Sequence, residues 1–339
     1  MQMRCLVTGA AGFIGSHLSE RLVKKGYQVI GIDNFKSGIR ENFKSLENNL
    51  NFNFIECDVR NLNNLKKIDL TYDYVFHLAA LADIVPSIEE PNEYIDVNVL
   101  GTTNILEYTK GPKLKKFLYA ASSSCYGIPD NYPTVEDSEI RPLYPYALSK
   151  YLGEQVVLAW SSFYQVPVIS LRLFNVYGPR ARTSGNYGAV FGVFLAQKLN
   201  GKPLTIVGDG EQTRDFTYIE DVVEAFITAA ESSYKAEIYN VGSGKTYSIN
   251  YLADLIGGQK VKLPKRPAEP DVTFASIEKI TKELGWKPKT EFEQGVAILL
   301  SNIEYWKNAP IWDVKSIRSA TANWFKYLSN YNNRGKFEE

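Results

Sequence analysis

The sequence predicts an α/β fold with a Rossmann-type, doubly wound parallel sheet and a smaller, discontinuous α/β lobe. Short apolar runs rich in Val, Ile, Leu and Phe alternate with longer stretches of helical period, as expected for repeated strand–helix units around a parallel sheet. Six such runs lie within roughly the first 175 residues, which is the number of strands in a complete sheet of this kind. A glycine-rich segment follows the first run directly, where this fold has its first tight turn.

The predicted elements alternate regularly in the first half of the chain. The expected strands are Arg4–Thr8, Val29–Asp33, Phe52–Cys57, Tyr74–Leu78, Phe117–Ala121 and Val168–Phe174. The expected helices between them are Gly12–Lys25, Leu62–Lys67, Pro91–Thr109 and Tyr146–Phe163.

The pattern loosens after Asn175, where a second lobe is expected to begin. A helix at Val190–Asn200 and a strand at Leu204–Val207 belong to it, whereas a helix at Ile219–Ser232 and a strand at Glu237–Val241 indicate a return to the first domain. Further helices are expected at Ile277–Leu284, Phe292–Asn308 and Val314–Tyr327. The predicted division is 1–175 and 217–245 for the first domain, 176–216 and 246–330 for the lobe, and 331–339 for a frayed tail.

Composition restricts the class of protein. The 339 residues carry 38 Lys and Arg and 38 Asp and Glu, so no overall field favours nucleic acid or an anionic membrane, and an anionic ligand needs local groups. The first residues lack the pattern of a signal peptide and no run approaches about 20 apolar residues, so we expect neither export nor a membrane-spanning helix. Two histidines and three scattered cysteines, Cys5, Cys57 and Cys125, disfavour a metal site or a disulfide framework. We expect a cytoplasmic enzyme without a metal.

The glycine motif predicts a dinucleotide site. Gly9, Gly12 and Gly15 follow the first strand and open a helix, so backbone N–H groups can approach a pyrophosphate at the positive end of the helix dipole. Asp33 ends the next strand, where its carboxylate can accept hydrogen bonds from a ribose and repel a 2′-phosphate. NAD is therefore preferred, although the nearby Lys36 and Arg40 leave NADP open. An ordinary glycine-rich turn and a solvated aspartate are the alternative interpretation.

Tyr146 and Lys150 indicate the chemistry. They stand four residues apart on a predicted helix and therefore share one face. A phenol is a poor base at neutral pH, and a neighbouring ammonium together with the positive nicotinamide would lower its pKa. Alone this spacing is common in helices, but the serine cluster Ser122–Ser124 just beyond the fifth strand strengthens the prediction.

These motifs together resemble the extended short-chain dehydrogenase/reductase family. The resemblance also rests on Asp58-Val59, His77-Leu78-Ala79-Ala80, Asn98-Val99-x-Gly101, the segment Arg172 to Pro179, and Gly208-Asp209-Gly210 followed by Arg214-Asp215-Phe216. It covers nearly the whole chain. Within the family the chain looks most similar to nucleotide-sugar epimerases typified by UDP-glucose and UDP-N-acetylglucosamine 4-epimerases.

The resemblance implies roles for individual residues. Tyr146 would be the base, Lys150 would hold the nicotinamide ribose, and Ser122 would bind the reacting oxygen, with Ser123 and Ser124 as alternatives. The residues implied for NAD are Gly9, Gly12, Phe13, Ile14, Gly15, Asp33, Asn34, Ser37, Gly38, Asp58, Val59, Leu78, Ala79, Ala80, Asn98, Tyr146 and Lys150. Those implied for the nucleotide-sugar are Ser87, Asn175, Val190, Arg214, Tyr218, Arg266 and Asp271.

The implied reaction is epimerisation at C4 through a transient 4-keto sugar, with NAD kept bound between turnovers. A 4,6-dehydratase or a decarboxylase would need a carboxylate beside the catalytic serine, where this chain has Ser123 and Ser124. A uronate-sugar epimerase stays open, because Arg180 or Arg182 could pair with a sugar carboxylate. A non-enzymatic NAD-binding sensor or scaffold and a net NAD reductase are the remaining alternatives. The resemblance further implies a homodimer built through Pro91–Thr109 and Tyr146–Phe163.

Overall fold

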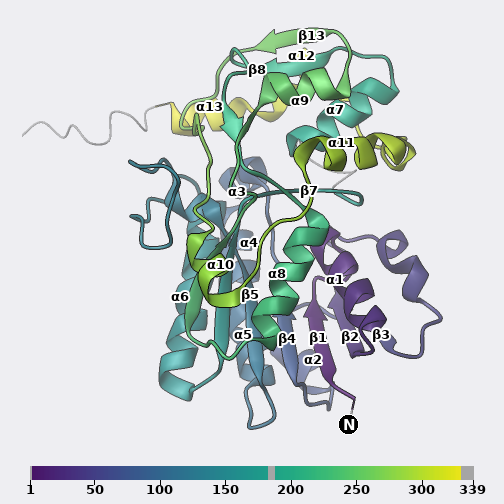
Figure 1. Ribbon diagram of the computed structural model, residues 1–339, viewed down its shortest axis with the longest axis vertical. Coiled ribbons are helices and arrows are strands. Elements are labelled where there is room, and N and C mark those ends of the chain that lie inside the picture. Colours follow the sequence, from purple (N-terminus) through teal and green to yellow (C-terminus); the bar gives the residue numbers. More distant parts are fainter. Residues whose placement is uncertain (1, 182–187, 330–339) are drawn as a thin grey trace, which may run out of the picture.

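The computed structural model describes residues 2–181 and 188–329. Its centre is a seven-stranded sheet with the order β11-β6-β5-β4-β1-β2-β3 (Figure 1). All neighbouring strands run parallel, and the order reverses between β1 and β4, as in a doubly wound sheet. The strands are β1 (Arg4–Thr8), β2 (Gln28–Asp33), β3 (Phe52–Glu56), β4 (Tyr74–His77), β5 (Lys116–Ser122), β6 (Val168–Leu173) and β11 (Glu237–Val241).

Helices cover both faces of this sheet, which explains why its strands are apolar on both sides. Along β1, Cys5 and Val7 belong to one buried cluster and Leu6 to the other, because successive side chains point to opposite faces. The first cluster includes side chains of α1 (Phe13–Lys24) and α8 (Ile219–Glu231). The second includes side chains of α5 (Gly101–Thr109) and α6 (Pro145–Tyr164), and α2 (Leu62–Lys66) also packs on α5.

A second group of elements lies beyond one end of the sheet and is discontinuous in sequence (Figure 1). In it β8 (Leu204–Val207) pairs with β13 (Lys260–Leu263), although β11 of the main sheet comes between them in the chain. Two further small pairs are β7 (Asn175–Tyr177) with β10 (Phe216–Tyr218) and β9 (Thr213–Arg214) with β12 (Tyr247–Ser248).

The helices not yet named are distributed over both parts of the molecule. Three of them lie beside the main sheet, namely α3 (Ile84–Glu89), α4 (Pro91–Ile95) and α10 (Glu278–Leu284). The others are α7 (Val190–Leu199), α9 (Ile249–Ile256), α11 (Phe292–Ser301), α12 (Val314–Ala320) and α13 (Ala322–Leu328).

The predicted fold class is confirmed, including the return of the chain to the sheet through α8 and β11. Three predicted helices are interrupted. Pro91–Thr109 contains a π turn at Asp96–Leu100 between α4 and α5, and Phe292–Asn308 ends as α11 before a 3₁₀ turn at Ile303–Trp306. The last helix is divided at Thr321, whose hydroxyl donates to the carbonyl of Ile317. The predicted tail 331–339 lies outside the described residues.

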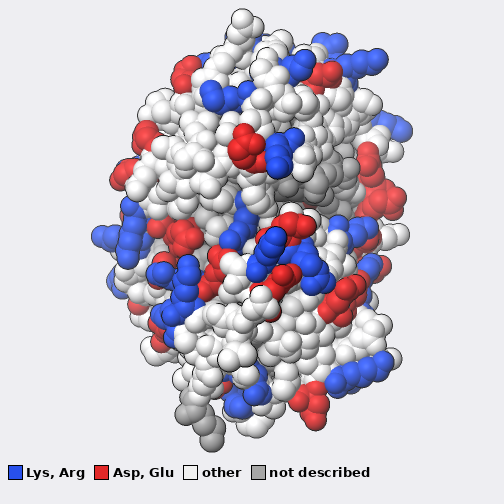
Figure 2. All heavy atoms as spheres, turned by 90° about the vertical axis from the view of Figure 1, so that its right-hand side faces the viewer, with Lys and Arg blue, Asp and Glu red and all other residues white. Residues whose placement is uncertain are grey.

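Charges of both signs are interspersed on the face shown in Figure 2, consistent with equal numbers of acidic and basic residues. Across residues 2–181 and 188–329, each helix is too short or too polar to cross a membrane. The same part of the chain holds no group of three or more His, Cys, Asp and Glu side chains arranged to bind a metal.

Candidate active site

A cavity of about 920 Å³ follows the carboxyl ends of the central strands and continues into the second group of elements. Its lining begins at Gly9 beyond β1, passes Asp33 at the end of β2 and Ser122 at the end of β5, and reaches Arg214 and Arg266. Ligands of doubly wound folds bind at this edge of the sheet. The volume lies at the upper end of the range for small-molecule sites.

The glycine loop has the shape required to hold a pyrophosphate. Gly9 has a φ of +71°, and a Cβ there would lie 2.9 Å from the backbone nitrogen of Ala79. A Cβ on Gly15 would lie 2.1 Å from the carbonyl oxygen of Gly9, so only glycine allows α1 to begin this close to β1. Gly12 is the N-cap of α1, and no side chain caps it. The N–H groups of the first turn are therefore available for an anion.

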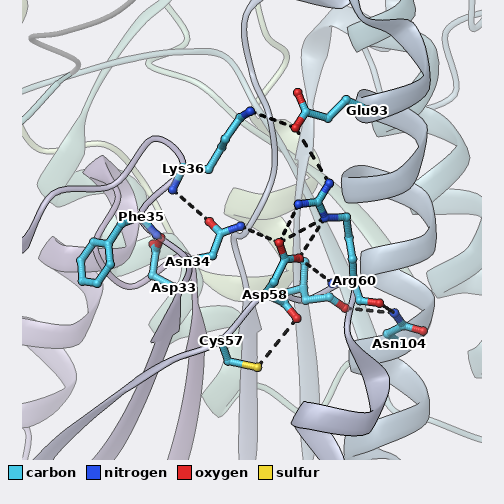
Figure 3. Close-up of polar contacts among 10 residues, drawn as sticks. Asp33, Asn34, Phe35, Lys36, Cys57, Asp58, Arg60, Glu93 and Asn104 are labelled. Atoms are coloured by element: carbon cyan, nitrogen blue, oxygen red, sulfur yellow. Dashed lines mark hydrogen bonds and ion pairs between the residues drawn. The ribbon is translucent and has the colours of Figure 1, made fainter.

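The acidic residue at the end of β2 lines the cavity and also supports the glycine loop. Asp33 accepts hydrogen bonds from the backbone N–H groups of Ala11, at 3.0 Å, and Phe35, at 2.8 Å. Figure 3 shows Asp33 beside Phe35. Burial raises the pKa of Asp33, and these two hydrogen bonds oppose the shift. The carboxylate is thus fixed at the position where the ribose of an adenine nucleotide is expected.

Lys36 and Arg40, the two cations that kept NADP as an alternative cofactor, have other partners in the structure. Lys36 lies 3.0 Å from Glu93, and the guanidinium of Arg40 lies 5.3 Å from the ring centroid of Phe35 (Figure 3 shows the Lys36 pair). Beside them Asp58 accepts from Asn34 at 2.8 Å and forms an ion pair with Arg60 at 2.7 Å. The hydrogen bonds from Arg60 are the main reason that the pKa of Asp58 falls to about 2. This end of the cavity therefore suits a ribose hydroxyl better than a 2′-phosphate.

Side chains from the end of β5, from the 3₁₀ turn Ser123–Tyr126 that follows it and from α6 come together in the lining of the cavity. The hydroxyl of Tyr146 donates to Oγ of Ser122 at 3.2 Å, and Oγ of Ser122 lies 2.7 Å from Oγ of Ser124. Lys150 is buried one turn further along α6, with Nζ 4.4 Å from the ring centroid of Tyr119. Ser123 also lines the cavity. The structure thus brings together the residues predicted to carry the chemistry.

The pKa of Tyr146 differs from the expectation from sequence. Burial raises the pKa of the phenol, and hydrogen bonds with Ser122 and Ser124 only partly oppose this. Burial also lowers the pKa of Lys150 to about 7, against the attraction of Glu154. Desolvation thus dominates at both groups, because it penalises the charged form of each one. Positive charge brought by the cofactor would act in the opposite direction on the phenol.

Replacing Lys150 with Met is expected to stabilise the NAD-free protein near pH 7 while abolishing turnover. In wild type the unfolded lysine stays protonated up to about pH 10.4, whereas the folded one loses its proton above a pKa of about 7. The stability of wild type therefore rises with pH between these values, and Lys150→Met removes the penalty. In thermal melts, the melting temperature of the variant should exceed that of wild type at pH 7, and this difference should be smaller at pH 10. An equal difference at both values would contradict the assigned pKa.

Asn98 holds the backbone around the site. It is buried at the π turn, where its side chain accepts from the N–H of Leu81 at 2.8 Å and donates to the carbonyl of Leu81 at 3.0 Å. It also donates to Oγ of Ser149 at 2.9 Å, and Ser149 donates to the carbonyl of Tyr146. The π turn inserts an extra residue into the helix at this point, as is frequent near functional sites. Asn98 does not line the cavity but links the loop after β4 to α6.

The other end of the cavity carries two arginines around one carboxylate. Arg214 lies 3.1 Å from Glu269, and Arg266 lies 3.7 Å from the same side chain. Asn175 accepts from Thr273 at 2.8 Å, and Val190 begins α7 at the cavity wall. Guanidinium groups suit a diphosphate, because each one presents several N–H donors that can form charge-assisted hydrogen bonds with the phosphate oxygens.

Four further predicted residues lie away from the cavity lining. Ser87 is buried and donates to the carbonyl of Ile84, and Gly38 packs closely on Ala11. Tyr218 is buried with its ring centroid 5.5 Å from that of Tyr177. Asp271 is exposed and forms an ion pair with Lys265 at 2.6 Å.

Sequence reasoning missed several residues of the lining. Glu269 stands three residues after Arg266, and this spacing was the available signal for an acidic partner. Arg180, considered for a sugar carboxylate, lines the cavity but already pairs with Glu20 at 2.7 Å. Arg182 lies outside the described residues. Gln212, Thr273, Tyr144 and Trp324 are among the other lining residues that sequence reasoning missed.

A doubly wound sheet with a glycine loop, a strand-end aspartate and a Ser–Tyr–Lys group defines an enzyme that uses a dinucleotide. A model of the NAD dependent epimerase/dehydratase family matches residues 5–242. The chain is 38% identical over 299 residues to a putative UDP-glucose 4-epimerase of Methanocaldococcus jannaschii, covering 86% of this chain and 95% of that protein. The chain therefore belongs to the NAD dependent epimerase/dehydratase family, and its cofactor is NAD.

Solved structures show the same similarity. A UDP-glucuronic acid 4-epimerase from Bacillus cereus, in complex with UDP-glucuronic acid and NAD, superposes with a TM-score of 0.83 at 36% identity, over 89% of this chain and 99% of that one. A UDP-N-acetylglucosamine 4-epimerase from Methanobrevibacter ruminantium M1, in complex with UDP-N-acetylmuramic acid, gives 0.82 at 35% identity, over 89% and 99%.

Proposed function

We propose that this chain is an NAD-dependent UDP-sugar 4-epimerase that acts through a transient 4-keto sugar. The observation that carries the proposal is the hydrogen-bonded group of Tyr146 and Ser122 one helical turn from Lys150. The neighbouring positions are hydroxyls, Ser123 and Ser124, with no carboxylate among them to assist loss of water. Similarity to proteins named as UDP-glucose, UDP-glucuronate and UDP-N-acetylglucosamine 4-epimerases supports the same reaction.

In this proposal each residue handles protons or charge at a defined place. The glycine loop and Asp33 would hold NAD, which would supply a reversible acceptor for the hydrogen at C4 as a hydride. Tyr146 removes the proton of the C4 hydroxyl, and Ser122 hydrogen-bonds the same oxygen as it becomes a carbonyl. Arg214 and Arg266 hold the diphosphate while the sugar turns over between the two halves of the reaction. Tyr146 then gives its proton back to the oxygen at C4, so the product is an isomer with no net redox change.

We further propose that residues 1–175 and 217–245 bind the cofactor and residues 176–216 and 246–330 bind the nucleotide-sugar. The glycine loop and Asp33 lie in the first set, and Arg214 and Arg266 lie in the second.

The substrate is tested by incubating the enzyme separately with UDP-glucose, UDP-N-acetylglucosamine, UDP-glucuronate and GDP-mannose. The anomeric NMR signals should reveal a new 4-epimer from at least one UDP-sugar and none from GDP-mannose. A 4-keto-6-deoxy product would instead indicate a dehydratase, and release of carbon dioxide from UDP-glucuronate a decarboxylase. Unchanged spectra with all three UDP-sugars would refute the proposed reaction.

We also propose a homodimer formed by the paired helical segments α4 to α5 and α6. They pack on each other and expose Ile95, Leu100, Leu148 and Leu152 to 37%, 48%, 41% and 36%. Four such side chains on neighbouring helices form an apolar surface suited to a second copy. Light scattering should give twice the chain mass of 38.3 kDa, and Leu152→Asp should shift the mass to that of one chain. A wild-type monomer at micromolar concentration would contradict the dimer.

A further inference from the structure

An aromatic row joins the catalytic phenol to one of the two arginines. The rings of Tyr144 and Tyr146 stack with centroids 6.3 Å apart and planes inclined by 9°. Trp324, from α13 near the end of the chain, extends this row, with its ring centroid 6.4 Å from that of Tyr144. The guanidinium of Arg266 lies 5.3 Å from the centroid of Trp324. All four side chains line the cavity.

Trp324 is held firmly in this position. Its side chain is 4% exposed, and its indole N–H donates to the carbonyl of Pro267 at 2.8 Å, next to Arg266 in the chain. The same ring packs with Val85 of α3 and Leu328 of α13 in a small buried cluster. Asn323 of α13 donates to Glu89 of α3 at 3.0 Å. Helix α13 therefore connects the loop that carries Arg266 to α3, which belongs to the proposed cofactor-binding residues 1–175 (Figure 1 shows α13 at the end of the chain).

The aromatic row contacts Arg266 at one end and approaches the serine cluster at the other. A desolvated aromatic face attracts a guanidinium and limits its orientation, so Trp324 reduces the freedom of Arg266 before a diphosphate arrives. Burial is the main cause that raises the pKa of Tyr144; Glu269 raises it further, and Arg214 and Ser124 lower it. Tyr144 therefore lies near both the serine cluster and the arginine pair, and its ring neighbours that of Trp324.

We propose that Trp324 is a positioning residue that sets the separation between the diphosphate-binding arginine and the catalytic phenol. This inference rests on the proposed function, in which one substrate reaches both groups at once. A nucleotide-sugar reacts only if its C4 hydroxyl meets Tyr146 while its diphosphate is held by Arg266, and small errors in such a separation lower the rate strongly. Trp324 acts through these two residues and not on the reacting atoms.

The test compares Trp324→Leu, Trp324→Phe and Leu328→Ala in the full chain with NAD bound. Calorimetry with UDP measures the affinity of the diphosphate-binding end alone. The kcat for the UDP-sugar that wild type epimerises also depends on the distance between that end and Tyr146. Trp324→Leu should bind UDP roughly 2- to 30-fold more weakly, the range expected for a lost desolvated cation–π contact, and should also lower kcat. Trp324→Phe keeps a ring and should recover most of both losses. Leu328→Ala loosens the same buried cluster without touching Arg266 and should bind UDP within about twofold of wild type.

Coupling to Arg266 provides the second part of the test. In the Arg266→Ala background, Trp324→Leu should weaken UDP binding no further, because its effect on the diphosphate passes through that arginine. Additive losses in the double variant would overturn the inference, as would a Leu328→Ala variant that reproduces the defects of Trp324→Leu. Wild-type affinity and kcat in Trp324→Leu would overturn it while leaving the proposed function intact. A wild-type chain that does not bind UDP would overturn both.

Discussion

Tyr146→Phe is expected to lower turnover at least roughly a hundredfold, the scale of a lost general base. The change removes the one hydroxyl that lies 3.2 Å from Ser122 and that would exchange a proton with the sugar. The ring remains, so its stack with Tyr144 is preserved and UDP should still bind. Steady-state turnover with the preferred UDP-sugar, together with UDP affinity and NAD content, checks the prediction.

Tyr164→Phe is a matched control, because Tyr164 ends the same helix and its side chain is 53% exposed. It should turn over at the wild-type rate. If Tyr146→Phe retained turnover within about twofold of wild type, far from the effect of removing a general base, Tyr146 would not be the base. A sensor or scaffold that merely holds NAD would then become the better interpretation.

Glu154→Gln is expected to lower the free energy of unfolding by about 3–5 kcal/mol, the usual cost of breaking a buried ion pair. Glu154 and Arg172 are 1% and 3% exposed and lie 2.6 Å apart. Arg172 also donates to Tyr126 and to the carbonyl of Glu136, and Ser170 donates to Glu154. Glutamine has the shape of glutamate but leaves the guanidinium of Arg172 buried without its counter-charge. The network fixes α6, and with it Tyr146 and Lys150, against β6.

Urea unfolding measures this loss, with Glu107→Gln as the control. Glu107 forms a surface pair with Lys110 at 2.8 Å on α5, and such pairs contribute only about 0.3–0.5 kcal/mol. Equal stability of the two variants would show that the pair between Glu154 and Arg172 does not anchor the helix.

The cofactor end of the site was predictable because its parts are neighbours in sequence. Strand, glycine turn and helix are contiguous from β1 to α1, and the geometry at Gly9 and Gly15 agrees with the roles that the spacing suggested. Tyr146 and Lys150 were equally accessible, since one helical turn fixes their relation. The π turn at Asp96–Leu100 left no comparable signal, because it depends on what Asn98 contacts across the fold.

The substrate end depends on contacts between distant segments. Trp324 reaches the cavity from a helix more than a hundred residues beyond Arg214, and no local pattern connects them. Sequence reasoning assigned Asp271 to the nucleotide ribose by resemblance and gave no role to Glu269, the acidic side chain that lies near both arginines. The direction of the pKa shift of Tyr146 could not be read either, because it is decided by burial and not by the spacing of Lys150.

The fate of the hydrogen at C4 tests the central claim most directly. The UDP-sugar that proves to be epimerised is labelled with deuterium at C4 and converted in ordinary water, and the product is examined by NMR and mass spectrometry. If the same hydrogen is removed from C4 and returned to it without exchange with water, the product keeps the deuterium at C4, and the configuration at C4 is inverted. Replacement of the deuterium by solvent hydrogen would contradict the account.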